Sequence, residues 1–465
     1  MDAYQLKAFD KAILGSSFLL TGGAGSGKSF VVNNIIEQFA SSAIVCAPTW
    51  NAATLINGVS IHNAFKILPN RLSEIEYDGE RISLQWANKH IKCLNLAGKV
   101  EMVIIDEISM VSGDMLMWID MALRKTYKYG KPFGGVQMIF VGDFSQLPPI
   151  TCVKYRHVFD CPVWKEFITP NDVVHLRLIH RQEEVPFLSA LERVRQGLGY
   201  EFFNSRIISP EAADKLLEED PSIVRLSPKR QMCISINDKH LASLPGEAKT
   251  IQAVDILKKG TVVIPTETAG YNAPPVMALK VGAKIILTRS LEPKRKNHNG
   301  KVFYIKQIAP LYAETLEETL SKDSKNELHI YARDKNNLIF NTLSRKTTDV
   351  KLLFAVAVSS TPDGEVELVI HPHAEIQSSY GHIVSMRIQL PIVVGYAITI
   401  HRSQGMTFTA EILYLDGSFS SGMIYVALSR CKTLSKLYIV GTLPDSNDMD
   451  LEVLRYLRKI NVILE

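Results

Sequence analysis

The sequence lacks the features that mark a metal-stabilised, disulfide-stabilised or membrane-spanning protein. Its six cysteines are scattered, without C-x-x-C pairs or a nearby histidine framework, which argues against a structural zinc site and a disulfide scaffold. The longest apolar stretch, Leu390 to Ile400, contains Pro391 and Gly395 and is too short to cross a bilayer. No secretory or organellar leader is visible, because Asp2 interrupts the start. We therefore expect a soluble intracellular protein, cytoplasmic or nuclear, without a membrane partner.

An excess of one charge is also missing. The chain has 52 Lys and Arg against 48 Asp and Glu, so the net charge of +4 does not by itself identify a polyanionic partner. Any nucleic-acid surface must then be a local groove. The sequence has no internal repeat or low-complexity tract, and 46% of its residues are hydrophobic, as in a globular protein with several cores. Its 465 residues predict about three domains.

The most informative segment that is present is rich in glycine and lies between an apolar run and a helical pattern. It consists of Gly22, Gly23, Ala24, Gly25, Ser26, Gly27, Lys28 and Ser29. Glycines let backbone N–H groups turn inward, and the amino end of a helix adds partial positive charge. Lys28 can then reach the β and γ phosphates, and Ser29 can bind Mg²⁺. The segment predicts a nucleoside triphosphate site, with a simple glycine-rich turn as the alternative.

Two carboxylates follow a later apolar strand pattern. Asp106 and Glu107 come directly after Met102 to Ile105, as expected where a parallel strand ends at a nucleotide. Asp106 can hold Mg²⁺, and Glu107 can orient and deprotonate the attacking water. Acidic pairs in this position often only cap a helix, but the preceding phosphate loop favours the catalytic interpretation.

A third strand pattern ends in the segment Gly142 to Pro149. Its two prolines stiffen the exit from the strand and would hold Gln146 where it can sense the γ phosphate. A plain turn is the alternative interpretation.

The order of apolar runs predicts an α/β fold. In the first half, β-branched runs alternate with helical patterns, which is typical of a parallel sheet covered by helices. These runs are Phe18 to Leu20, Ala43 to Ala47, Glu101 to Ile105, Gln137 to Val141 and Val173 to Leu176. A second set predicts another α/β lobe: Ser222 to Leu226, Lys284 to Thr288, Ile392 to Ala397, Glu411 to Leu415 and Lys436 to Val440.

Two stretches interrupt this alternation. The polar stretch from about Asn63 to Lys99 predicts a small insertion in the first lobe. Residues 301–386 predict a β-rich module inserted in the second lobe, because period-two segments alternate with turn signals there. The segments are Val302 to Ile308, Glu327 to Ala332, Val350 to Val358 and Glu365 to His371.

Taken in order, these motifs resemble those of DNA helicases of superfamily 1, in the branch that moves 5′ to 3′. Within that branch the chain is similar to the PIF-like (petite integration frequency) helicases, relatives of RecD and of the phage Dda helicase. The phosphate loop is similar to motif I, Asp106 to Met110 to motif II, and Tyr425 to Arg430 to motif VI. The other matches are Gln5 with Ala8-Phe9 (Q motif), Ala47 to Thr49 with Ala52-Ala53 and then Ser60 to His62 (motif Ia), Pro132 to Gly135 just before the strand Gln137 to Val141 (motif III), Leu176 with Arg181-Gln182 (motif IV), and Thr399 to Gly405 (motif V). Departures from the pattern are Trp50, Tyr396 and Arg402, where Gly, Trp and Lys are usual.

The resemblance implies roles for further residues. Gln5 would read adenine, and Gln404 and Gly405 would join the phosphate loop in binding nucleotide. Arg181 and Arg430 would act as arginine fingers, with a surface ion pair as the alternative for each. DNA contact is implied for Pro48, Thr49, His62, Thr399 and His401, although either histidine could instead be a core residue. Phe65, Trp86, Phe133 and Phe144 could stack on bases or belong to the core.

The resemblance implies two RecA-like P-loop lobes. The first would span residues 1–175 with an insertion at about 63–99, and the second 176–300 and 387–465, with a Src-homology-three-like insertion at 301–386. The expected activity is an ATP- and Mg²⁺-dependent DNA helicase that moves 5′ to 3′ on single strands and unwinds duplex forks, in replication, recombination or repair, alongside the proteins of those processes. Alternatives are a translocase that separates no duplex, and a recombination or packaging subunit that acts by binding a partner. A viral, phage or bacterial source fits this reading.

Overall fold

The computed structural model divides the chain into two compact units, Met1–Cys233 with Ile398–Glu465, and Ile234–Ala397. It describes residues 1–39, 42–49, 52–53, 56, 58–67, 69–94, 100–127, 130–150, 152–257, 261–266, 273–288, 302–310, 353–361, 364–370, 372–379, 382–417, 420–444 and 449–463. Trp50 and the expected segment Glu327 to Ala332 lie outside these residues. Within the described part, no helix is both long enough and apolar enough to span a bilayer.

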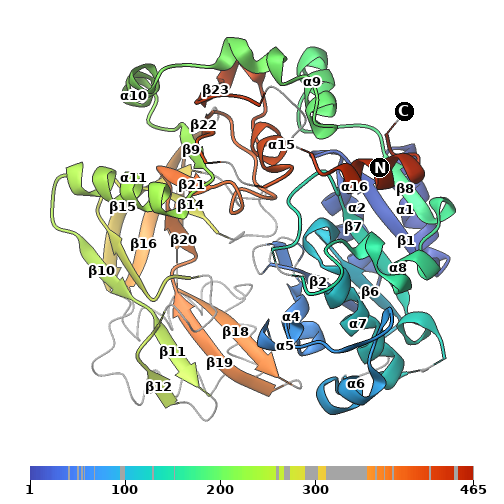
Figure 1. The fold of residues 1–465 in the computed structure, drawn as a ribbon. Helices are drawn as coiled ribbons and strands as arrows, with labels where there is room; N and C mark the ends of the chain where they lie inside the picture. The colour runs from blue at the N-terminus through green and yellow to red at the C-terminus, as the bar shows by residue number, and fades with distance from the viewer. Residues whose placement is uncertain are drawn as a thin grey trace. The chain divides into compact units, whose positions relative to one another are not determined.

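The first unit is built on a six-stranded sheet in the order β3-β2-β6-β7-β1-β8, and its neighbouring strands pair in parallel (Figure 1). The strands are β1 (Phe18–Gly22), β2 (Ala43–Ala47), β3 (Val59–Ser60), β6 (Met102–Ile105), β7 (Gln137–Gly142) and β8 (Val173–Leu176). The parallel sheet that the first five runs predicted is therefore confirmed. Every residue of β1 and β6 is buried, because helices cover both faces of the sheet.

Alternate residues of β1 point to different cores. Phe18 and Leu20 pack with α1 (Ala3–Ile13) and α2 (Lys28–Phe39), whereas Leu19 belongs to the larger core on the other face. That larger core also contains residues of α7 (Gly113–Thr126) and α8 (Pro162–Phe167). The period-two burial follows from the alternation of side chains along a strand.

The expected insertion of the first lobe forms short elements: α4 (Ile61–Phe65), α5 (Pro69–Leu72), β4 (Tyr77–Asp78) paired with β5 (Arg81–Ile82), and α6 (Leu84–His90). Phe65, Trp86, Phe133 and Phe144 are all at most 4% exposed and belong to the larger core. These four aromatic side chains are therefore core residues here rather than a stacking surface for bases.

A second sheet in the first unit has the order β21-β9-β22-β23, and β22 pairs in parallel with both β9 and β23. Its strands are β9 (Val224–Ser227), β21 (Ala397–Thr399), β22 (Glu411–Tyr414) and β23 (Leu437–Val440). Around it lie α9 (Val185–Arg195), α10 (Pro210–Glu219) and α15 (Met423–Leu428). The chain is thus α/β with two parallel sheets flanked by helices, as predicted.

The C-terminal helix α16 (Leu451–Lys459) packs against the first sheet although it follows the last strand of the second. Val453, Leu454 and Leu457 of α16 are buried in the larger core of the first sheet. The indole N–H of Trp164 donates to the Tyr456 hydroxyl at 2.8 Å. The chain therefore connects the two sheets twice, while the lobe limits expected from the sequence stay predictions.

The second unit consists of antiparallel sheets and the greater part of α11 (Arg230–Ser243). One sheet has the order β17-β16-β15-β14-β20 and another β12-β11-β19-β18, with β10 and β13 forming a pair. The strands are β10 (Lys249–Gln252), β11 (Val254–Leu257), β12 (Thr261–Val263), β13 (Val276–Leu279), β14 (Lys284–Leu287), β15 (Val302–Pro310), β16 (Leu353–Thr361), β17 (Gly364–Ile370), β18 (His373–Ser379), β19 (His382–Gln389) and β20 (Ile392–Val394).

Three of the four alternating segments predicted in the β-rich region are strands: β15, β16 and β17. The assignment of Lys284 to Thr288 and Ile392 to Ala397 to a second α/β lobe was wrong in part. β14 and β20 instead pair antiparallel with each other, and β14 also pairs antiparallel with β15. A short, buried strand has the same kind of apolar sequence in a parallel and in an antiparallel sheet, so the type of sheet depends only on which strands pair with it.

Candidate nucleotide site

The glycine-rich loop connects β1 to α2, and its backbone explains the glycines. Gly25 and Gly27 have φ of +84° and +85°, a region that residues with a side chain rarely adopt. A Cβ atom at Gly25 would lie 2.5 Å from Cβ of Arg181, and one at Gly27 would lie 2.5 Å from Nε2 of Gln5. Both residues expected from the family pattern to face nucleotide, Gln5 and Arg181, therefore pack directly on this loop.

Lys28 folds back over the loop. Its Nζ donates to the carbonyl oxygens of Gly22 at 2.7 Å and Gly23 at 3.1 Å. Burial lowers the pKa of Lys28, and the charges of Asp143, Glu107 and Asp106 act against that effect. The ammonium group is thus close to the carboxylates of motifs II and III, where a bound phosphate chain would bring further negative charge.

The two serines of the loop differ in exposure. The Ser26 hydroxyl is buried and has no hydrogen-bond partner among the described residues, whereas Ser29 is exposed. An unpartnered buried hydroxyl is rare in proteins and marks a place where a ligand can supply the partner. Ser29 is the second residue of α2, so its hydroxyl is accessible at the amino end of that helix.

The acidic pair sits at the carboxyl end of β6. Glu107 has φ +52° and ψ +48°, a left-handed conformation whose cost is of order 1–3 kcal/mol for a residue with a side chain. Burial raises the pKa of Asp106, and it also raises that of Glu107, to about 7, with further help from the charge of Asp106. Such strain and such a pKa are common where a carboxylate must exchange protons near neutral pH.

Gln146 is buried in the turn after β7, and its backbone N–H donates to the Asp143 carbonyl oxygen at 2.9 Å. This turn contacts the start of α15 closely. A Cβ atom at Gly422, which has φ +73°, would lie 2.4 Å from the Ser145 carbonyl oxygen and 2.7 Å from that of Gln146. The turn after β7 therefore packs against Gly422, the N-cap residue of α15.

Arg181 and Gln182 hold the backbone of motif VI. Arg181 Nη1 donates to the Ser429 carbonyl oxygen at 2.9 Å, and Gln182 Nε2 donates to the carbonyl oxygens of Ser429 at 3.1 Å and Cys431 at 2.9 Å. Burial lowers the pKa of Arg181 to about 9, and the charge of Arg430 adds to this. The contact of motif IV with motif VI is therefore direct.

Arg430 is 2% exposed and is folded onto α15, where its Nε donates to the Val426 carbonyl oxygen at 2.8 Å. Burial lowers its pKa, while the charge of Glu107 opposes this most among the neighbouring groups. Within the described residues, neither Arg181 nor Arg430 forms an ion pair, so the alternative of a surface ion pair does not describe either side chain. From motif V, Gln404 Nε2 lies 3.5 Å from Glu107 Oε2; Gly405, with φ +76°, follows it.

Gln5 is buried beside the loop, with Nε2 3.4 Å from the Ser26 carbonyl oxygen. Its Oε1 accepts from the backbone N–H of Asp2 at 3.0 Å, which completes the capping box of α1. The structure thus gathers Gln5, Lys28, Asp106, Glu107, Gln146, Arg181, Gln404 and Arg430 around one phosphate loop. Their individual roles stay predictions.

The candidate DNA residues lie where strands end. Pro48 and Thr49 follow β2, and Thr399 ends β21. Each threonine hydroxyl caps a turn: Thr49 Oγ1 accepts from the Ala52 N–H at 3.2 Å, and Thr399 Oγ1 from the Arg402 N–H at 3.3 Å.

His62 and His401 are half-buried, and burial lowers the pKa of both. The lowered pKa favours the uncharged form of both rings at neutral pH. They can form hydrogen bonds to a nucleic-acid backbone but bring no positive charge to it.

Sequence reasoning missed three residues at this site: Asp143, Arg195 and Tyr425. The Asp143 carboxylate is fully buried and is bound by Arg195, which is 1% exposed. The Tyr425 hydroxyl contacts both Asp143 and the phosphate loop. Asp143 follows an apolar strand as Asp106 does, which was a usable signal. Nothing in the local sequence distinguishes Arg195 from other helical arginines.

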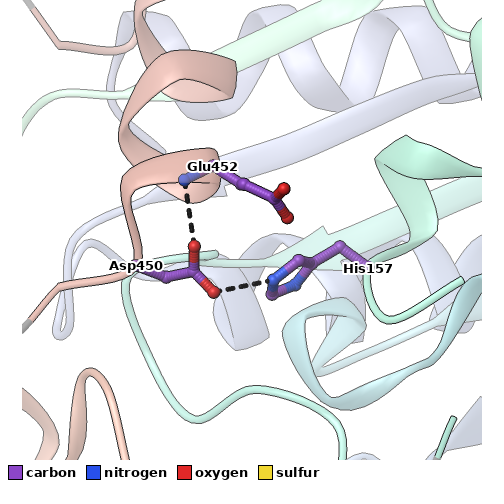
Figure 2. Close-up of side chains that lie close together, drawn as sticks. All are labelled: His157, Asp450 and Glu452. Carbon is purple, nitrogen blue, oxygen red and sulfur yellow. Dashed lines mark hydrogen bonds and ion pairs between the residues drawn. The ribbon is translucent and has the colours of Figure 1, made fainter.

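Three side chains of the kinds that can bind metals lie close together away from the nucleotide site. Among the described residues, His157, Asp450 and Glu452 have donor atoms within 4.8 Å of one another (Figure 2). The His157 ring accepts from the backbone N–H of Asp160, and its Nε2 lies 3.1 Å from Asp450 Oδ2. We therefore assign the proton to Nε2, which leaves no ring lone pair for a metal. The arrangement is instead explained by the hydrogen bond between His157 and Asp450, which attaches α16 to the first sheet.

Comparison with known proteins shows which proteins this chain resembles. Residues 3–198 match the PIF1-like helicase family. The chain is 28% identical to an ATP-dependent DNA helicase Pif1 of Bdellovibrio bacteriovorus, over 98% of this chain and 91% of that protein. The chain is thus similar to PIF1-like helicases over nearly its whole length. It is also 27% identical to human ATP-dependent DNA helicase PIF1, over 96% of this chain but only 62% of the human protein.

Solved structures of Pif1 helicases show the same fold as this chain. The Pif1 helicase of Candida albicans aligns with a TM-score of 0.68 at 21% identity, covering 99% of both chains. A Bacteroides Pif1 bound to single-stranded DNA aligns with a TM-score of 0.62 at 23% identity, covering 98% of this chain and 96% of that one. The two RecA-like lobes expected from the motifs are thus confirmed as the fold.

Proposed function

We propose that this protein converts ATP hydrolysis into 5′ to 3′ movement along single-stranded DNA and separates the duplex ahead of it. It is an ATP-dependent DNA helicase, like the curated relatives that match nearly its whole length. One observation carries the mechanism: Gln404, from the second sheet's lobe, lies 3.5 Å from Glu107 of the first, and the charge of Glu107 also acts on the pKa of Arg430. Residues of both lobes therefore act on one reaction centre.

Each reacting group has a residue suited to it. Lys28 would bind the β and γ phosphates, because its ammonium already lies over the loop. Glu107 would take the proton of the attacking water, since burial keeps its pKa near neutrality, at about 7. Arg430 would leave its backbone carbonyl partner and stabilise charge on the transferring phosphate, with Gln146 and Arg181 supporting the same region.

Ser29 and Asp106 would hold Mg²⁺. Hydroxyl and carboxylate oxygens are the ligands this ion prefers, and Asp106 is a buried carboxylate that a cation would neutralise favourably. When bound, Mg²⁺ would offset the negative charge that develops on the phosphate oxygens.

Movement would come from changes in the separation of the lobes. ATP draws together residues of the two lobes, and the products let them part, so a strand bound by both is advanced. We assign the strand to Pro48, Thr49 and His62 in the first lobe and to Thr399 and His401 in the second. The β-rich segment 301–386 is proposed as a clamp on that strand. The polarity rests on the family resemblance.

An unwinding assay tests this proposal. A duplex with a 5′ single-stranded tail should be unwound in the presence of ATP and Mg²⁺, and a duplex with only a 3′ tail should not. Glu107→Gln is the control for contaminating helicases. DNA-stimulated ATPase without strand separation would support the translocase alternative, and unwinding only from the 3′ tail would reverse the assigned polarity.

A further inference from the structure

The Tyr425 hydroxyl lies between the phosphate loop and Asp143. It accepts a hydrogen bond from the Ala24 backbone N–H at 2.9 Å and donates one to Asp143 Oδ2 at 3.2 Å. Tyr425 is 2% exposed and Asp143 is fully buried. A Cβ atom at Gly23 would lie 3.5 Å from the same hydroxyl, so the loop backbone approaches it closely. One side chain of motif VI thus contacts motifs I and III together.

Asp143 is held rigidly from the other side. Arg195 Nε donates to Oδ1 at 3.2 Å and Oδ2 at 3.1 Å, and Arg195 Nη2 donates to Oδ1 at 3.1 Å. The Ser145 backbone N–H also donates to Oδ1, at 3.2 Å. Burial would raise the pKa of Asp143, but the charges of Arg195 and Lys28 outweigh it and lower that pKa. The carboxylate is therefore ionised and is a fixed acceptor for the Tyr425 hydroxyl.

The helix that carries Tyr425 also sets the position of Arg430. At its start, Gly422 rests on the carbonyl oxygens of Ser145 and Gln146, where any Cβ atom would clash. All six residues of α15 are buried. Beyond its end, Arg430 donates to the carbonyl oxygen of Val426, one residue after Tyr425. Displacement of Tyr425 would therefore displace Arg430 as well.

We propose that Tyr425 is a positioning residue for the ATPase reaction. Its hydroxyl links the phosphate loop and Asp143 to α15, and this link sets the position of Arg430 relative to the transferring phosphate. The inference rests on the proposed function. Backbone N–H groups of a phosphate loop are the groups that bind phosphate. A hydrogen bond from one of them to the Arg430 helix makes the loop and the arginine move together. Arg195 serves the same arrangement by fixing Asp143.

Tyr425→Phe tests this directly, because it removes only the hydroxyl. The kcat of the DNA-stimulated ATPase should fall about tenfold, the size of a lost hydrogen bond to a charged group. The KM for ATP should stay within about twofold, because Lys28 and the loop still bind phosphate. Binding of a fluorescent ADP analogue and the thermal midpoint should match wild type, which shows that the variant is folded. Tyr438→Phe, at a half-buried tyrosine of β23, is the matched control and should keep the wild-type kcat.

A double-mutant cycle separates positioning from packing. If Tyr425 acts through Arg430, Tyr425→Phe should lower kcat less than twofold further in the Arg430→Ala background. Multiplicative losses would overturn the inference, as would an unchanged kcat in Tyr425→Phe or a loss that appears only in KM. A wild-type protein without ATPase activity would overturn the proposed function and this inference together, whereas an active wild type with a fully active Tyr425→Phe variant would overturn this inference alone.

Discussion

At the scale of single residues, Lys28 and Glu107 have separable tasks. Lys28→Ala should weaken nucleotide binding and abolish turnover, because the ammonium over the loop is the group that meets phosphate. Glu107→Gln should keep nucleotide binding and lose hydrolysis, because the amide cannot accept the proton of water. Fluorescent-nucleotide titration and steady-state ATPase assays on the same preparations measure both quantities. Near-normal turnover in either variant would contradict the assignment.

Arg430 should affect rate more than affinity. Arg430→Ala should leave ATP affinity close to wild type and lower kcat on the order of 10³-fold, if the guanidinium acts on charge that develops only in the transition state. Arg430 donates to the Val426 carbonyl oxygen, so removal of its side chain leaves the contacts between Lys28 and the phosphate loop intact. Arg193→Ala, at an exposed arginine of α9 that is paired with Glu201, is a control for removal of an arginine elsewhere and should keep the wild-type kcat. Equal losses in kcat and in affinity would assign Arg430 to ground-state binding instead.

At the scale of secondary-structure elements, the attachment of α16 should depend on pH. The hydrogen bond from His157 holds the pKa of Asp450 at about 2, below the 3.8 of an unperturbed Asp. A lowered pKa means that the ionised carboxylate adds stability above pH 3.8 and that this contribution is lost as the pH falls through about 2. Asp450 also caps α16 by accepting from the Glu452 N–H at 2.9 Å.

Asp450→Asn should therefore lower the free energy of unfolding by about 1 kcal/mol at pH 7, because the carboxylate is partly screened by solvent. The deficit relative to wild type should shrink as the pH is lowered toward 3. Urea titrations followed by tryptophan fluorescence measure it. Glu452→Gln is the matched control and should change stability by less than about 0.5 kcal/mol. A deficit that grew on acidification would mean that Asp450 is not the titrating group.

The secondary-structure elements also show how much of the fold and of the nucleotide site could be predicted from the sequence. The phosphate loop and the ends of β6 and β7 are local patterns, so their strands and their gathering at one sheet edge could be predicted. The partners of β14 and β20 could not be predicted, because an apolar strand of three or four residues fits either type of sheet. The Arg195–Asp143 pair joins residues 52 positions apart and depends on how α9 packs, which no local pattern encodes. The packing of α16 on the first sheet could not be predicted either, because no local pattern encodes it.

At the scale of the whole molecule, binding to single-stranded DNA should depend on salt even though the net charge is only +4. Each phosphate neutralised by Lys or Arg releases counterions, so the log–log slope of affinity against salt should be about −0.7 per contacted phosphate. Burial lowers the pKa of His62 and His401, so these neutral rings should add affinity without adding to the slope. Arg402, next to His401 in motif V, is positively charged and should make the salt slope steeper.

Two variants separate these contributions. Arg402→Gln should make the slope shallower by about 0.7, whereas His62→Gln should weaken binding by a similar factor at every salt concentration and leave the slope unchanged. Fluorescence anisotropy with a labelled oligonucleotide between about 50 and 200 mM NaCl measures both. Lys28→Ala, which alters only the nucleotide site, should keep the wild-type slope. A flat salt response in the wild-type protein would mean that no phosphate-binding groove exists, and a slope that changes in His62→Gln would mean that this ring is charged when it meets DNA.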